Sequence, residues 1–315
     1  MTDRALVVGE TLVDMLPAGP APLSQVDRFD RRFGGGPANV AVGLSRLGDS
    51  PLFWTRVGAD PFGDFLVGRL ADEGVLTDLV ERDDEARTGL AFVSLDESGE
   101  RAFSFYRDGS ADTRLSPDRA GDIPLSGVDW VHVGGLLLAA DPSRSATLRL
   151  ARRASRAGIT VSFDPNARPE LWTEFDYGRS VRTMLGLADV VKASPADLAE
   201  AGFAVNGDPT DVAAAVADVG PHTILLTLGA DGAYATSAGA WPGTTEVAQP
   251  GYDVETVDTT GAGDAFLAGA IAALRAGESL DNAVAFANAV AALTTTERGA
   301  VEAVPTRSVV RAFRS

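Results

Sequence analysis

The chain contains no cysteine, a single lysine and two histidines among its 315 residues. Without cysteine it can form neither disulfides nor thiolate metal sites, which fits a reducing compartment. Two histidines cannot supply a zinc site by themselves, so we expect His132 and His222, which lie in strand-like segments, to pack or hydrogen-bond instead. The lone lysine, Lys192, leaves arginine to carry nearly all of the positive charge.

Positive charge is scarce as a whole, because 27 lysines and arginines face 44 aspartates and glutamates, for a net charge of −17. Nucleic acids and anionic membranes bind basic surfaces, so we expect neither as a partner. No apolar run reaches the roughly 20 residues that a bilayer-spanning helix needs. The sequence enters a strand-like run at residues 5–8 without a charged and apolar leader. We therefore expect a soluble, cytoplasmic protein.

Strand-like runs alternate with helix-like runs along most of the chain. The helix-like segments stop at glycines, which suit the left-handed position after a helix end. This alternation predicts a mostly parallel sheet with helices on both faces, and an active site at the carboxyl ends of its strands. The expected strands are residues 6–8, 52–54, 130–133, 159–163, 190–191 and 223–226, and the expected stop glycines are Gly48, Gly74, Gly158 and Gly220.

Two segments interrupt the alternation. Residues 11–33 have strand character without a helix, and residues 89–106 read as a hairpin with its polar turn at 96–100. We expect the two segments, approximately 12–33 and 88–113, to form a small β-sheet that stands off the main body as a lid. A surface ornament without a function is the alternative.

The most informative motif is the glycine-rich turn at residues 258–266, followed by apolar residues at helical spacing up to Leu274. Gly261 and Gly263 let the backbone approach a ligand, and a helix N-terminus offers unpaired N–H groups to a phosphate. Asp264 lies at that anion site, where a carboxylate can serve as the general base that takes a proton from an attacking hydroxyl. The alternative is an ordinary helix start with Asp264 as a first-turn charge.

A second glycine cluster covers residues 34–36 and precedes Pro37, which suits a first helical turn, and Asn39. The glycines would admit a ligand to backbone N–H groups, and Asn39 supplies a donor and an acceptor to sugar-like hydroxyls. Asp14 lies just past the first strand, where its carboxylate can bind a diol. A flexible hinge and a turn carboxylate are the respective alternatives.

Together, residues 34–48 and 258–266 resemble the two signatures of the ribokinase (PfkB-type) carbohydrate kinase family, and the likeness spans nearly the whole chain. The resemblance implies one domain over residues 1–315, an α/β/α sandwich with a β lid, and ATP-dependent phosphorylation of a sugar hydroxyl. It implies that Asp264 is the base and that the N–H groups of Gly261, Ala262 and Gly263 form the anion hole. By the same resemblance, Asp14, Gly35, Gly36 and Asn39 hold the sugar.

Residues 105–112 and 164–172 resemble motifs of the fructokinase branch of that family. Arg107 and Arg168, one in each motif, can bind sugar oxygens or phosphate with planar guanidinium groups. Their alternative is an ordinary Asp–Arg surface network. Relatives that phosphorylate 2-keto-3-deoxygluconate carry both arginines, but often have a tyrosine where this chain has Ala91 and depart from its glycine motif.

The resemblance also implies a nucleotide site. The loop with Thr227, Gly229 and Gly232 is similar to the family's ATP loop, and Asn288 matches a position near the base or ribose. Ser194 and Asp197 occupy the place of residues near the magnesium-bound phosphates. Ser194, Pro195 and Asp197 also have the spacing of a capping box, and the two interpretations are compatible.

Asp258 and Thr260, together with backbone oxygens around Thr294, Glu297 and Gly299, match the family's monovalent-cation loop. Oxygen ligands suit a hard alkali cation, and in relatives potassium there orders the anion hole. The alternative for Asp258 is a helix cap.

The predicted function is an ATP- and Mg²⁺-dependent fructokinase that makes fructose 6-phosphate and binds potassium. The alternatives are a 2-keto-3-deoxygluconate kinase, then a ribokinase or nucleoside kinase, and, from another class, a catalytically silent sugar-binding regulator. The intact Asp264 motif argues against the regulator. The expected partners are the sugar and ATP, and the resemblance leaves open a homodimer through the exposed face of the lid.

Overall fold

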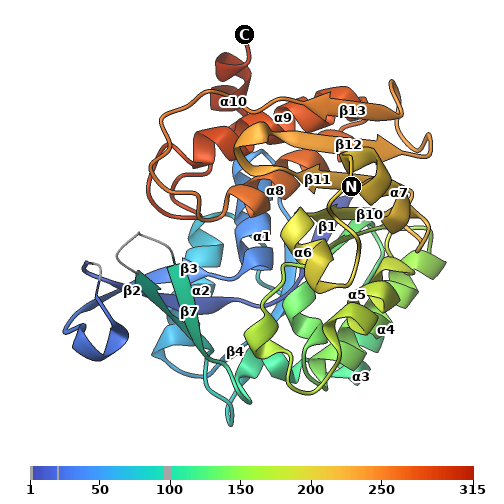
Figure 1. Ribbon diagram of the computed structural model, residues 1–315. Helices are drawn as coiled ribbons and strands as arrows, with labels where there is room; N and C mark the ends of the chain where they lie inside the picture. The colour runs from blue at the N-terminus through green and yellow to red at the C-terminus, as the bar shows by residue number, and fades with distance from the viewer. Residues whose placement is uncertain (1–2, 20, 96–100) are drawn as a thin grey trace.

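The computed structural model describes residues 3–19, 21–95 and 101–315, which form two sheets of very different size. The main sheet has nine strands in the order β13-β12-β11-β10-β9-β8-β1-β4-β5, and the second sheet has four in the order β3-β2-β6-β7. Figure 1 shows the second sheet standing to one side of the main body.

The main sheet is parallel from β5 to β11 and antiparallel at the edge that carries β12 and β13. Its central strands are runs of β-branched and other apolar residues, as expected for strands buried on both faces. Their bounds are β1 Arg4–Val8, β4 Leu52–Gly58, β5 Val80–Asp83, β8 Val128–Gly134, β9 Thr160–Asp164, β10 Val190–Ala193, β11 Thr223–Thr227, β12 Ala233–Ser237 and β13 Glu246–Gln249.

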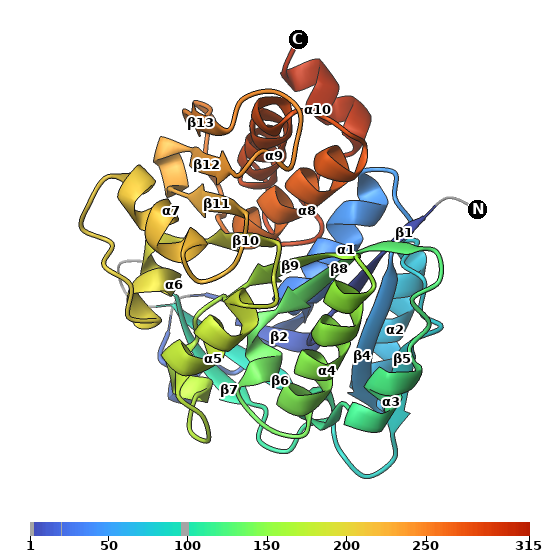
Figure 2. The same ribbon diagram turned by 90° about the vertical axis from the view of Figure 1, so that its right-hand side faces the viewer.

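Helices cover both faces of this sheet, as Figure 2 shows edge-on. The central strand β1 alternates between the two resulting cores: Ala5 and Val7 belong to one, Leu6 and Val8 to the other, and all four are fully buried. One face carries α1 Gly36–Arg46, α2 Pro61–Asp72, α8 Ala262–Arg275, α9 Leu280–Thr294 and α10 Arg307–Phe313. The opposite face carries α3 Pro117–Asp122, α4 Ser143–Arg156, α5 Tyr177–Leu185, α6 Pro195–Glu200 and α7 Pro209–Ala217. The predicted α/β sandwich is therefore confirmed.

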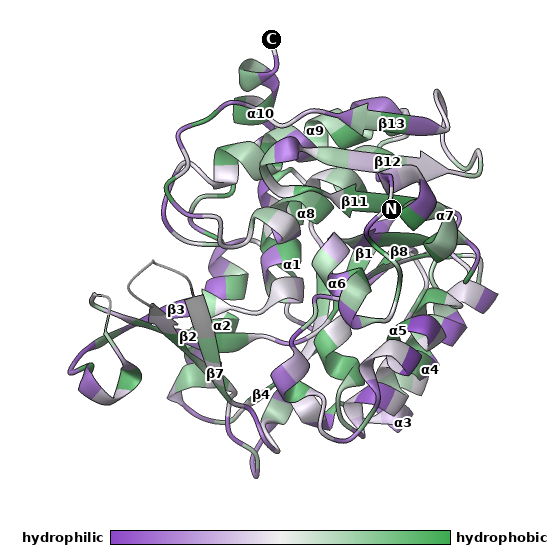
Figure 3. Ribbon diagram, viewed as in Figure 1, coloured by the Kyte–Doolittle hydropathy of each residue, from purple (hydrophilic) through white to green (hydrophobic). Residues whose placement is uncertain are grey.

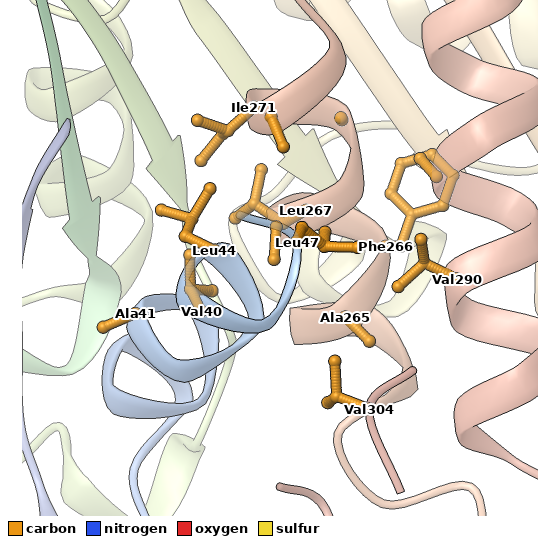
Figure 4. Close-up of a cluster of buried hydrophobic side chains, with 14 of the residues drawn as sticks. Val40, Ala41, Leu44, Leu47, Ala265, Phe266, Leu267, Ile271, Val290 and Val304 are labelled. Atoms are coloured by element: carbon orange, nitrogen blue, oxygen red, sulfur yellow. The ribbon is translucent and has the colours of Figure 1, made fainter. Parts of the chain in front are cut away.

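The packing of α1 against α8 positions two predicted motifs relative to each other. Figure 4 shows Val40 and Leu44 of α1 facing Leu267 and Ile271 of α8 across an apolar interface. These side chains are at most 1% exposed. A β-carbon on Gly43 would lie 2.6 Å from the methyl group of Ala268, so the glycine permits the close approach of the two helices.

The second sheet consists of β2 Leu12–Pro17, β3 Phe29–Gly34, β6 Leu90–Leu95 and β7 Arg101–Tyr106. β2 and β3 pair antiparallel, as do β6 and β7, and the parallel pair β2–β6 joins the two hairpins. The predicted hairpin at 89–106 is confirmed in its strands, while its turn at 96–100 lies outside the described residues.

In Figure 3, hydrophobic colour follows the inner strand β11, and hydrophilic patches mark the outer helices α4 and α5.

Some expectations about individual elements were wrong. Gly48, Gly74 and Gly158 have the left-handed backbone predicted for helix ends, but Gly220 does not, because α7 ends earlier, at Ala217. Sequence reasoning also missed β5, β12 and β13, which lie at or near the edges of the sheet. Among the described residues, no helix combines the length and the apolar character needed to cross a membrane.

Candidate active site

Several predicted residues converge at the carboxyl edge of the main sheet, where β1, β8, β9 and β10 end beside the start of α8. A pocket there is lined by Glu10, Gly36, His132, Gly134, Asn166 and Asp264, among others. These side chains arrive from strand ends and helix starts far apart in the sequence. This is the edge at which sheets of this kind bind ligands.

The turn before α8 depends on Gly261. This glycine has φ 76° and serves as the N-cap of a helix that begins at Ala262. A β-carbon on Gly261 would lie 2.7–3.0 Å from atoms of Ala300, so both backbone angle and space exclude a larger residue. The N–H groups of the first turn therefore lie at the N-terminus of α8, where the sequence predicts an anion site, and the Ala262 amide donates to the Thr259 carbonyl at 3.2 Å.

Asp264 lies in the first turn of α8 and accepts a hydrogen bond of 2.8 Å from Asn39 Nδ2 of α1. Burial raises the pKa of Asp264 to about 6, and the nearby Asp164 carboxyl raises it too, while Asn39, Lys192 and Arg168 lower it. A pKa near neutrality suits a group that must accept a proton at physiological pH. The structure therefore joins the two predicted motifs through one hydrogen bond.

The glycine turn before α1 is equally constrained. Gly35 has φ 108°, and a β-carbon on it would lie 2.5 Å from the Glu10 carbonyl oxygen. A β-carbon on Gly36 would lie 2.8 Å from Asn166 Nδ2 and 3.3 Å from Asp264 Oδ1. Gly34 leaves room for the Asp14 carboxyl, which would otherwise meet its β-carbon at 2.4 Å. The Asp14 carboxyl thus lies against the glycine turn, so the predicted sugar residues Asp14, Gly35 and Gly36 are close together in the structure.

Arg107 was open to interpretation as part of a surface network, and that alternative is wrong. Its side chain is 4% exposed and its Nε donates to Asp112 Oδ2 at 2.5 Å, with Asp112 only 1% exposed. Ser110 Oγ donates to the other Asp112 oxygen at 2.5 Å. The Arg107 charge is therefore neutralised by a buried partner, while its Nη2 has no hydrogen-bond partner among the described residues.

Arg168 is less tightly held. Its Nη1 donates to the carbonyl oxygen of Ala167 at 2.6 Å, and its guanidinium lies 5.7 Å from the ring centre of Phe103 in β7. The arginine therefore reaches from the end of the main sheet to the second sheet. Its charge also acts on Asp264, whose pKa it lowers.

Lys192 forms the buried ion pair that sequence reasoning missed. Its Nζ donates to Asp164 Oδ2 at 3.0 Å, and both side chains are less than a tenth exposed. Burial by itself lowers the pKa of Lys192, but Asp164, Asp197 and Asp264 together raise it above its usual range, so the ammonium stays charged. A β-carbon on Gly263 would lie 2.9 Å from Nζ, which places the only lysine against the predicted anion hole.

Ser194 and Asp197 form the capping box at the start of α6. Ser194 Oγ accepts from the Asp197 amide at 3.2 Å, and Asp197 Oδ2 accepts from the Ser194 amide at 2.9 Å. The other Asp197 oxygen accepts from the Ala167 amide at 2.8 Å. Burial raises the pKa of Asp197, but Lys192 and the hydrogen bonds from Ser194 and Ala167 outweigh it and hold that pKa below its usual range.

The predicted nucleotide residues meet beyond β11. Thr227 ends the strand, and Gly229 and Gly232 follow with φ 64° and 98°. A β-carbon on Gly232 would lie 2.1 Å from the carbonyl oxygen of Gln249, so this loop packs directly on residues 249–251. Asn288 Nδ2 donates to the carbonyl of Pro250 at 2.8 Å and so joins the same group from α9.

The predicted cation loop is brought together in part. Asp258 Oδ1 accepts from the amide and hydroxyl of Thr260, at 2.9 and 2.6 Å, and Oδ2 accepts from the Gly299 amide at 3.1 Å. Thr294 is fully buried and its hydroxyl donates to the Val290 carbonyl at 2.9 Å, whereas Glu297 is exposed. The Asp258 carboxylate therefore holds Thr260 and Gly299 together through its two oxygens.

Both histidines hydrogen-bond as expected, His132 with Ser162 at 3.1 Å and His222 with Thr223 at 2.8 Å. Burial lowers the pKa of His132 to about 3, so the ring is neutral in the pocket. In the part of the chain that the structure describes, no three histidine or carboxylate side chains cluster in a way that could hold a metal ion.

Three further pocket residues, Glu10, Asp164 and Asn166, were not among the predicted site residues. Asn166 has φ 42°, a left-handed backbone that is rare outside glycine and that marks strain at functional sites. Asp164 ends the buried strand β9, and Glu10 and Asn166 come two residues after the ends of β1 and β9. The signals in the sequence are these positions and, for Asp164 and Asn166, the motif at residues 164–172.

Comparisons with known proteins agree with this geometry. Residues 2–307 match the family model described as pfkB family carbohydrate kinase. A fructokinase of Klebsiella pneumoniae is 40% identical over 318 residues, which cover 97% of each chain. A fructokinase of Xylella fastidiosa, solved with bound ATP, superposes with a TM-score of 0.88 at 33% identity, covering 99% of this chain and 98% of its own. A double mutant of the Vibrio cholerae fructokinase, solved with fructose, ADP and potassium, gives a TM-score of 0.85 at 35% identity, covering 100% and 99%.

Proposed function

Since the chain belongs to the pfkB family of carbohydrate kinases and is an ATP-dependent sugar kinase, we propose that its substrate is fructose and its product fructose 6-phosphate. The observation that carries the proposal is the Asp264–Asn39 hydrogen bond, which places a carboxyl of raised pKa between the glycine turn before α1 and the N-terminus of α8. Relatives that match nearly the full length of this chain include fructokinases of Vibrio alginolyticus and Klebsiella pneumoniae.

On the sugar side, Asp264 is the general base. Asn39 holds its carboxylate, and the substrate binds beside Asp14 and the adjacent glycine turn at Gly35 and Gly36. Asp264 takes the proton of the sugar hydroxyl as that oxygen forms a bond to the γ-phosphorus of ATP, and the bond between that phosphorus and the ADP oxygen breaks. The reaction leaves fructose 6-phosphate, ADP and a protonated Asp264.

On the phosphate side, the turn at Gly261, Ala262 and Gly263 supplies the N–H groups for the transferring group; the Ala262 amide donates to the Thr259 carbonyl at 3.2 Å in this structure and is released when the phosphate binds. Lys192 adds a positive charge beside Gly263. Donors fixed before the reaction stabilise the charge that develops in the transition state. Mg²⁺ bound with ATP would supply neutralisation of phosphate charge, and Asp197 would be available to it, since a carboxylate offers about four lone-pair sites and three are used. Thr227, Gly229, Gly232 and Asn288 hold the rest of the nucleotide.

Fructose is favoured over 2-keto-3-deoxygluconate by the state of Arg107. A carboxylate substrate needs an arginine with charge to spare, but Arg107 is already paired with the buried Asp112. A neutral sugar needs only hydrogen-bond donors, and the unpartnered Nη2 supplies one. Ala91 is fully buried between Asp14 and Phe105 in the second sheet, at the place where relatives acting on the keto-acid often carry tyrosine.

The second sheet serves as the lid over the sugar, with Arg168 and Phe103 as one contact between lid and body. Closure excludes water and so suppresses hydrolysis of ATP. The loop that Asp258 and Thr260 form with Gly299 would hold potassium, which would help to order the turn before α8. A homodimer through the outer face of the lid, and a cytoplasmic location, remain predictions from the sequence.

The proposal is tested by ADP release from ATP and Mg²⁺ with fructose, 2-keto-3-deoxygluconate, ribose, glucose and adenosine, each with and without potassium. We expect kcat/KM for fructose to exceed that for every other sugar by about two orders of magnitude, because buried polar groups left unpaired by a wrong substrate cost several kcal/mol. Potassium should raise the rate. If the keto-acid were turned over faster than fructose, the keto-acid would be the substrate. ADP release that does not depend on any sugar would refute the assignment as a sugar kinase.

The pKa of Asp264 gives a second expectation. The base works only when ionised, so kcat/KM for the sugar should fall about tenfold per pH unit below about pH 6 and level off above it. Burial raises this pKa, so the limb lies well above the ordinary range of an aspartate. Rate measurements from pH 4.5 to 8 would check this, and a limb centred near pH 4 would contradict the assignment of Asp264 as the base.

A further inference from the structure

Glu10 is a buried carboxyl in the pocket to which none of the steps above assigns a role. It follows β1 at the carboxyl edge of the sheet and is 1% exposed. It lines the same pocket as Asp264, Gly36 and Asn166. A buried carboxyl is costly to keep, so its presence in the pocket requires a reason.

The two oxygens of Glu10 have different surroundings. Oε1 accepts a hydrogen bond of 3.2 Å from the Gly36 amide and so supports the glycine turn before α1. Oε2 is equally buried but has no hydrogen-bond partner among the described residues. Its neighbours are Gly134 and the Pro37 ring: a β-carbon on Gly134 would lie 3.5 Å from Oε2 and 2.3 Å from Cγ of Pro37, and neither residue offers Oε2 a donor. An acceptor left without a partner in this way is destabilising, and native structures seldom keep one.

Two other unpartnered buried atoms belong to predicted sugar residues, Asn39 Oδ1 and Arg107 Nη2. With Glu10 Oε2 they make two acceptors and one donor, the combination that a polyol satisfies, because each hydroxyl both donates and accepts. The Glu10 carboxyl also lies near the reacting group, since Oε1 and Asp264 Oδ1 are both within 4 Å of the position a β-carbon on Gly36 would take. The neighbouring charges act on Glu10: burial raises the pKa of its carboxyl to about 7, Arg107 lowers that pKa, and Asp112 and Asp264 raise it.

We propose that Glu10 is a further substrate-binding residue, whose Oε2 accepts a hydrogen bond from a hydroxyl of the sugar while Oε1 fixes the Gly36 amide. The ligand it fits is a neutral polyhydroxylated sugar. The inference rests on the proposed function in one respect, that this pocket holds the sugar, and it does not require that the sugar be fructose.

The test compares the unaltered protein with Glu10→Gln and Glu10→Ala, using whichever sugar of the panel the unaltered protein turns over fastest. Calorimetry gives the Kd of the sugar without ATP, kinetics give KM and kcat, and thermal unfolding gives the Tm of the unliganded protein. Thr147→Val is the matched control, because it removes another buried oxygen without a partner, in α4 and outside the pocket.

We expect Kd and KM for the sugar to rise about tenfold in Glu10→Gln and about tenfold to a hundredfold in Glu10→Ala, as for loss of a hydrogen bond to a charged group. The Tm of Glu10→Gln should stay level or rise, because a buried ionisable group is replaced by a neutral one whose oxygen can still accept from the Gly36 amide. Each monodeoxy analogue of the sugar lacks one hydroxyl. The analogue without the hydroxyl that contacts Oε2 should bind the unaltered protein weakly, and its Kd should not rise further in Glu10→Ala. The control should keep the unaltered Kd and KM.

Unchanged sugar affinity in both Glu10 variants would overturn the proposal. So would a Tm of Glu10→Gln lowered by several degrees together with equal losses for every monodeoxy analogue, since that result assigns Glu10 to support of the Gly36 turn alone. A preferred sugar other than fructose would overturn the proposed function and leave the Glu10 result to stand on its own measurements.

Discussion

Replacing Asp264 with asparagine should lower kcat for the preferred sugar by about two to four orders of magnitude, because a positioned general base typically contributes that much to the rate. Asparagine has the same shape and can still contact Asn39, so the Kd of the sugar should change by less than about threefold, well under the effect of losing a hydrogen bond. The acid limb near pH 6 should vanish with the carboxyl. Steady-state kinetics and calorimetry on the same preparation would measure both quantities.

The matched control is Asp281→Asn, the same chemical change in the first turn of the neighbouring helix α9. It removes a helix-terminal carboxylate outside the pocket, so kcat should be unchanged and stability should fall by about 0.3–1 kcal/mol. Near-normal turnover in Asp264→Asn would refute its role as the base. Equal losses in both variants would mean that only the charge at the start of the helix matters.

Replacing Lys192 with methionine should lower kcat by about 10²–10³-fold, the usual cost of losing one fixed donor to transition-state charge. It should also destabilise the protein by about 3–5 kcal/mol, because Asp164 is left buried without its partner. The two effects can be separated. The double variant Lys192→Met with Asp164→Asn removes the stranded charge, so its stability should recover while its turnover stays low.

Arg275→Met provides the control for this second prediction. Arg275 is as buried as Lys192, with 8% of its side chain exposed, and pairs with Asp49 and Asp129 outside the pocket. Its loss should reduce stability without reducing kcat. Denaturant unfolding and initial rates would be measured for the three variants. Recovery of turnover together with stability in the Lys192 double variant would show that the lysine acts on the fold only.

The sequence was most predictive where local pattern decides structure. Runs such as 223–226 are apolar on both faces and could only be inner strands, whereas β5 and β13 lie at edges, have charged residues such as Glu81 and Glu246, and carry no such pattern. Gly261 and Gly35 stood out because glycine is required wherever the backbone is left-handed and crowded.

The buried charges of the site were beyond reach of that reasoning. Lys192 and Asp164 are adjacent only because β9 and β10 are neighbours in the sheet, and nothing local to either residue indicates an ion pair. Arg107 and Asp112 could be placed in a motif, but their burial could not, and burial decides whether the pair is a surface detail or a neutralised charge inside the protein. Glu10 differs from a turn carboxylate only through what surrounds it in the fold.

The pairing of α1 with α8 has a consequence for how the protein comes to exist in the cell. The apolar face of α1, at residues 40–47, is covered by a helix that begins only at Ala262. At ribosomal speeds of about 5–20 residues per second, that face stays uncovered for about ten to forty seconds before α8 is synthesised. During synthesis the nascent chain therefore presents a hydrophobic surface to chaperones. Deletions near the C-terminus should accordingly lead to aggregation of the N-terminal half, rather than to a smaller folded fragment.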